Sequence, residues 1–177
     1  HLLENISGLN TSLADFSPAF YQNGIVYASE FGGGKTYERR NAPFLSLYYT
    51  ENIGEDGTEF SRPKPFTGDA ESKMHEAAVT FSPDGRTMYY TSNNVERKKG
   101  NDNVPVINLQ IFETKAKDNG IEWGESTPFP YNSSDYSVGH PTLSADGQTM
   151  YFASDMPGGY GETDIYVSYN QDGFWST

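Results

Sequence analysis

The sequence contains no cysteine, few basic residues and no long apolar run. The absence of cysteine among 177 residues excludes disulfides, thiolate nucleophiles and zinc–thiolate sites. Only 12 residues are Lys or Arg against 24 Asp or Glu, and the net charge of -12 argues against a nucleic-acid surface. No apolar run approaches the roughly 20 residues that cross a bilayer, so we expect no membrane insertion.

A short motif occurs three times in the sequence. Asp84-Gly85 and Asp146-Gly147 lie 62 residues apart, each between two β-rich runs. Asn23-Gly24 lies 61 residues before the first of them, in a similar setting. Asp-Gly and Asn-Gly between alternating apolar residues are typical of β-hairpin corners. We therefore predict three equivalent hairpins.

Each hairpin is followed by the second half of the unit. A further β-rich run comes next, and after it an aromatic residue precedes a small one. These pairs are Phe60-Ser61, Trp123-Gly124 and Trp175-Ser176. The unit therefore reads as four strands, with a variable loop between the second and the third. Four-stranded antiparallel sheets repeated along a chain are the blades of a β-propeller. We predict an all-β chain with about three such blades, which is a partial propeller.

The repeat places the whole chain in one propeller domain with four segments. Residues 1–14 are expected to be a lead-in or closing strand, 15–68 the first blade, 69–134 the second, and 135–177 a truncated third. Three blades fall short of the four to eight that typically close a ring. We therefore expect either a segment of a longer protein or closure of the ring by two copies.

The repeated motifs resemble those of a known family. Residues 82–85, 144–147 and 161–167 look like TolB-type propeller repeats, and 156–161 and 175–176 are similar to elements of periplasmic OmpA-family proteins of Bacteroidetes, including the PorE-like component of type IX secretion. The resemblance implies a periplasmic or outer-membrane-associated location and protein partners of the cell envelope. In that family, peptidoglycan is bound through a separate OmpA-like domain, which these residues do not match.

Four residues are candidates for a binding face. His75 and His140 lie near the start of the first strand of their units, which in a propeller lines the central channel. Two histidines with a few acids could bind a metal, but hydrogen bonding to a neighbouring loop backbone is the favoured interpretation. Tyr136 and Tyr160 fall outside the repeated aromatic positions, which blade packing already explains. These four residues make up the candidate binding face.

A calcium site is a weaker possibility in the last loop. Asp155, Glu162 and Asp164 bracket a glycine-rich turn, and oxygen-rich loops can hold calcium. The structural alternative is that Asp164 accepts hydrogen bonds from backbone N–H groups of the turn. The prediction favours this alternative and assigns no cofactor.

Enzyme signatures match poorly. Residues 82–87 approach the Asp box of sialidases, but Gly85 follows Asp84 directly, which breaks the pattern. No G-x-S-x-G nucleophile motif occurs. We therefore predict a non-catalytic binding and scaffold module with no catalytic residues. The alternative is an accessory or catalytic propeller of a hydrolase acting on carbohydrate or peptide.

Overall fold

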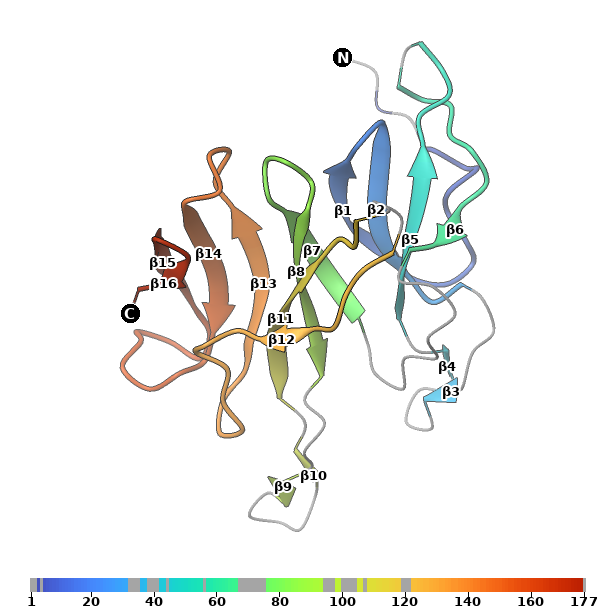
Figure 1. The fold of residues 1–177 in the computed structure, drawn as a ribbon. Coiled ribbons are helices and arrows are strands. Elements are labelled where there is room, and N and C mark those ends of the chain that lie inside the picture. The colour runs from blue at the N-terminus through green and yellow to red at the C-terminus, as the bar shows by residue number, and fades with distance from the viewer. Residues whose placement is uncertain are drawn as a thin grey trace. The chain divides into compact units, whose positions relative to one another are not determined.

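The computed structural model describes most of the chain, and all of its regular structure is β (Figure 1). The described residues are 3, 5–31, 36–37, 42–43, 45–55, 57–66, 76–93, 98–99, 105–106, 108–118 and 122–176. They contain no helix, and so none that is long and apolar enough to cross a membrane. The chain divides into two compact units, His1–Ala77 and Ala78–Thr177.

The first unit carries one four-stranded antiparallel sheet. Its strands are β1 (Asp15–Tyr21), β2 (Gly24–Ser29), β5 (Ser46–Glu51) and β6 (Lys64–Pro65), paired in that order. A small hairpin, β3 (Thr36–Tyr37) and β4 (Ala42–Pro43), lies in the connection from β2 to β5. Residues 5–14 precede the sheet without forming a strand; Ser7–Leu9 make a turn, and the Leu9 carbonyl accepts the Tyr27 hydroxyl at 3.4 Å.

The second unit carries two sheets of the same topology. The second sheet pairs β7 (Glu76–Phe81), β8 (Thr87–Asn93), β11 (Leu109–Lys115) and β12 (Thr127–Pro128), with a hairpin of β9 (Lys98–Lys99) and β10 (Pro105–Val106) between β8 and β11. The third pairs β13 (Val138–Leu143), β14 (Thr149–Ser154), β15 (Asp164–Gln171) and β16 (Phe174–Trp175). In each sheet spatial order follows chain order, so the predicted four-stranded antiparallel units are confirmed.

A buried hydroxyl recurs at one position of the third strand in every sheet. It donates to the carbonyl of the small residue that follows the repeated aromatic. The three pairs are Thr50 to Ser61 at 2.6 Å, Thr114 to Gly124 at 2.9 Å and Ser168 to Ser176 at 2.5 Å. Because a buried polar atom without a partner is costly, this bond explains why a hydroxyl and a small residue recur together.

The first strand of each unit is interrupted at one equivalent position. Ser17, Ala78 and His140 have φ values of 54°, 45° and 55°, in the left-handed region. Register shifts mark β-bulges there in β1 and β13. Left-handed backbone is uncommon for residues other than glycine, and bulges persist where they serve a purpose. The three units therefore share a left-handed position in the first strand as well as a topology.

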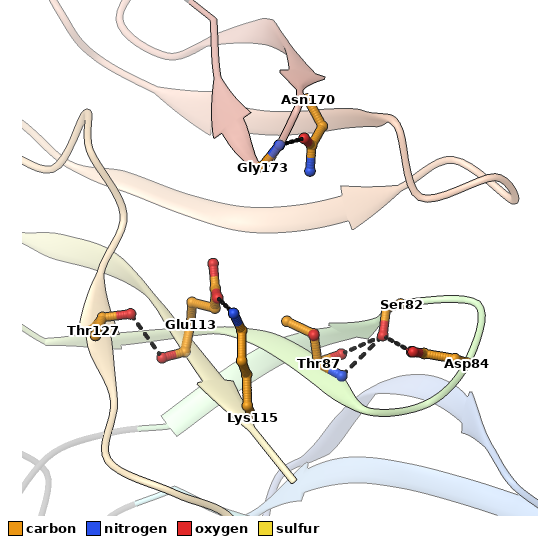
Figure 2. Close-up of polar contacts among 8 residues, drawn as sticks. All are labelled: Ser82, Asp84, Thr87, Glu113, Lys115, Thr127, Asn170 and Gly173. Atoms are coloured by element: carbon orange, nitrogen blue, oxygen red, sulfur yellow. Dashed lines mark hydrogen bonds and ion pairs between the residues drawn. The ribbon is translucent and has the colours of Figure 1, made fainter.

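Two hairpin corners, in the second and third sheets, are the same structure. In one, Asp84 Oδ1 accepts the Ser82 hydroxyl at 2.5 Å (Figure 2). It also accepts the Arg86 N–H at 3.0 Å. In the other, Asp146 Oδ1 accepts the Ser144 hydroxyl at 2.5 Å and the Gln148 N–H at 3.0 Å. The serine bond, followed by the backbone bond, lowers the pKa of both carboxyl groups. Gly85 and Gly147 have φ of 67° and 70°.

The corner of the first sheet differs, and here the prediction that Gly24 is equivalent to Gly85 and Gly147 is wrong. Tyr21 pairs with Gly24, so the turn consists of Gln22 and Asn23 alone. Gly24 is the first residue of β2, where an added Cβ would come within 1.9 Å of the Thr50 carbonyl oxygen. Glycine serves a close strand-to-strand approach here and not a left-handed corner.

The second and third sheets pack face to face around one core. In the third sheet, we call the face that carries Met150 and Phe152 the leading face. The opposite face, which carries Tyr151 and Val167, is the trailing face. Equivalent positions define the same two faces in the other sheets. The leading face of the third sheet covers the trailing face of the second, which carries Tyr89 and Ile111. The buried core comprises Tyr89, Ile111, Phe129, Val138, Met150, Phe152 and Trp175. Its rings make edge contacts, with the Tyr89 and Trp175 centroids 5.8 Å apart.

Candidate binding face

The connection from β14 to β15, residues 155–163, is held firmly where it leaves the sheet. The Asp155 carboxylate accepts the Ser137 N–H at 2.6 Å, and the Ser154 hydroxyl accepts the Met156 N–H at 3.1 Å. Tyr166 donates its hydroxyl to the Met156 carbonyl at 3.2 Å. Backbone and side chain together therefore define where the loop begins.

The first sheet repeats these anchors at the start of its own long connection. Glu30 takes the place of Asp155, and its carboxylate accepts the Ala14 N–H at 3.3 Å. The Ser29 hydroxyl accepts the Phe31 N–H at 2.9 Å, and Tyr48 donates to the Phe31 carbonyl. Sequence reasoning missed this anchor because Glu30 and Asp155 differ in residue type. Its recurrence assigns the Asp155 carboxylate to the framework of the unit.

A second anchor holds the far end of the loop. Asp164 Oδ2 accepts the N–H groups of Tyr160 and Gly161 at 2.7 and 3.1 Å. A Cβ added to Gly159 would lie 2.0 Å from the same oxygen, so only glycine lets the carboxylate close on the turn. The backbone-bonding role predicted for Asp164 is what the geometry shows.

Tyr160 stands at the tip of this anchored loop with its side chain fully exposed. Its own backbone N–H is bonded to Asp164, so the ring projects from a fixed base. A tyrosine offers a large contact area with few rotatable bonds, which suits a surface that binds protein. Of the four predicted binding residues, Tyr160 has the geometry of a contact residue.

The other predicted residues have different surroundings. His140 is exposed on β13, where its backbone N–H donates to Thr91 Oγ1 of the second sheet at 2.8 Å, while its imidazole is left to the solvent side. Tyr136 is half-buried and packs against the core shared by the two sheets. His75 lies outside the described residues. The bulge therefore displays His140, while Tyr136 serves packing.

No metal centre is assembled within the part of the chain that the structure describes. There, no three His, Cys, Asp or Glu side chains are grouped as ligands. Asp155 and Asp164 bond to backbone N–H groups at opposite ends of the loop, and Glu162 is exposed between them. The expectation of no cofactor, with calcium as its weaker alternative, stays a prediction.

Comparison with known proteins adds no identification. Neither a protein-family model nor a curated protein matches this chain.

Proposed function

We propose that the chain forms part of a β-propeller that serves as a non-catalytic binding and scaffold module. The observation that supports this most is the shared framework of the three sheets: one topology, one buried hydroxyl bond and one left-handed position in the first strand. The packing of the second sheet on the third adds to it, because propeller blades stack face to face on their neighbours.

The partner of this module is a protein of the cell envelope, in the periplasm or at the outer membrane. This part of the proposal comes from the resemblance of residues 82–85, 144–147 and 161–167 to envelope propellers. The anchored loop with Tyr160 at its tip is the contact surface that the geometry favours, because the framework holds the loop while leaving the ring free to bind. His140, on the bulged first strand, is the second contact residue.

The test combines capture and turnover. The purified chain is immobilised, challenged with cell-envelope extract, and the retained protein is identified, purified and titrated against the chain. Replacing Tyr160 with Ala is expected to weaken binding by about 30-fold, the effect of losing an interface hot spot of about 2 kcal/mol. Tyr160→Phe keeps the ring and is the matched control, with binding within about 3-fold of the parent chain.

Two results contradict the proposal. One is hydrolysis of a glycan or peptide from a substrate panel that disappears when a single acidic residue is replaced. The other is a purified partner whose affinity is the same for the Tyr160→Ala and Tyr160→Phe chains, since the loop then takes no part in binding.

A further inference from the structure

The trailing face of the third sheet is apolar and open to solvent. Tyr151, Ile165, Val167 and Tyr169 are 49%, 75%, 39% and 51% exposed, and their pairing across β14 and β15 places them on one face. Positions on this face carry no charge, although the chain as a whole is strongly acidic. A contiguous exposed apolar face of a sheet is typical of a site of interaction.

The same face of the second sheet shows what kind of surface covers it. Tyr89 and Ile111, which correspond to Tyr151 and Ile165, are only 6% and 0% exposed. Their cover is the leading face of the third sheet, chiefly Met150 and Phe152. Apolar side chains that alternate along a strand interlock with those of a facing sheet about 10 Å away.

Hydrogen bonds fix the position of the third sheet on the second. Thr80 Oγ1 accepts the N–H of Leu143 at 3.2 Å, next to the bulge of the covering strand. Thr142 holds the place of Thr80 in the third sheet and is exposed. The trailing face of the third sheet therefore offers both the apolar surface and the hydroxyl acceptor to which a leading face fits. A second hydrogen bond joins the two sheets, from the His140 N–H to Thr91 Oγ1. The third sheet has Ala153 at the place of Thr91, so this bond has no counterpart there.

The chain carries a further leading face, that of the first sheet. Ile25 and Tyr27 stand where the third sheet has Met150 and Phe152. Phe20, which corresponds to Leu143, is 91% exposed. Residues 5–10 lie over the end near Tyr27 and leave a groove of about 310 Å³, whereas the end with Phe20 is open. Phe20 is thus an exposed aromatic at the place where Leu143 joins a core.

We propose that the trailing face of the third sheet binds a second copy of this chain through the leading face of that copy's first sheet. The contact continues the established packing of the second sheet on the third, with one face type meeting the other. It joins unlike surfaces, so it leads to a closed ring or to an open chain of copies. The proposal rests on the repeat of the sheets and is independent of the envelope partner.

Sedimentation velocity of the purified chain over a concentration series tests this contact. The parent chain is expected to associate as its concentration rises. Ile165→Glu and Phe20→Glu, each of which places a charge in the contact, are both expected to abolish association. Ile53→Glu is the matched control, because Ile53 is 64% exposed on a turn of the first sheet outside both faces. It should associate like the parent chain.

Mixing the two defective variants provides the decisive measurement. The Ile165→Glu chain keeps its leading face, and the Phe20→Glu chain keeps its trailing face, so the mixture should form one-to-one pairs although neither variant associates alone. A parent chain that stays monomeric at every concentration overturns the proposal. So does normal association of Phe20→Glu, which would show trailing faces pairing with each other. Far-UV circular dichroism verifies folding, and Val167→Lys stands in for Ile165→Glu if that variant is unfolded.

Discussion

Ile111 and Ile165 are the same residue at the same position of two consecutive units, yet one is fully buried and the other is 75% exposed. Both lie on the trailing face and on the third strand, and both sheets have the same topology and buried hydroxyl bond. The difference is that the third sheet covers Ile111, while nothing described covers Ile165. The sequence of a unit thus determines its sheet, and the neighbouring sheet determines burial.

The largest effect is expected from truncating these two isoleucines. Ile111→Ala removes buried methyl groups and leaves a cavity, which should lower the free energy of unfolding by about 2–5 kcal/mol. Ile165→Ala should change it by no more than about 0.5 kcal/mol in the monomer, because the side chain is already in water. Urea denaturation, at a protein concentration too low for association, measures the free energy of unfolding of both variants. Equal losses would mean that Ile165 is covered within a single chain.

Removing the buried hydroxyls is expected to lower the free energy of unfolding by an intermediate amount. Thr114→Val and Ser168→Ala each deprive a carbonyl of its donor, and each should cost about 1–3 kcal/mol, with the two sheets alike because this bond belongs to the framework. Thr127→Val is the control. Its hydroxyl lies 3.4 Å from the Glu113 carbonyl at an exposed site (Figure 2), so its removal should cost less than about 0.5 kcal/mol. Urea denaturation again gives the values; a large loss at Thr127 alone would contradict the assignment.

The four-stranded units could be predicted because their signals are local. Corners at Asp84-Gly85 and Asp146-Gly147 and the aromatic at Trp123 or Trp175 mark strand ends by residue type. Gly24 shows the limit of this reasoning. A glycine beside Asn looks like a corner in sequence, but here it allows the Thr50 carbonyl to approach, and only the pairing of β2 with β5 reveals that.

The candidate site was less accessible from sequence, because its geometry depends on backbone and neighbours. The equivalent positions Ser17, Ala78 and His140 share a left-handed φ but no residue type, so no motif identifies them. Tyr160 falls outside the repeated aromatic pattern, which predicts a contact residue, and its exposure agrees with that prediction. Tyr136 falls outside the same pattern, but it packs against the core because the third sheet lies over the second.

The smallest expected effect is the loss of stability at the two matched hairpin corners in acid. Hydrogen bonds from Ser82 and Ser144, and then from backbone N–H groups, lower the pKa of Asp84 and Asp146. A carboxyl group with a lowered folded pKa adds stability above its unfolded pKa and loses it as pH falls through the folded value. Both corners should therefore weaken together below about pH 4, near the ordinary pKa of aspartate. Carboxyl carbon NMR can follow each titration. Ser144→Ala should raise the pKa of Asp146 and leave Asp84 as the internal reference; an unchanged Asp146 would show that the serine bond is not the cause.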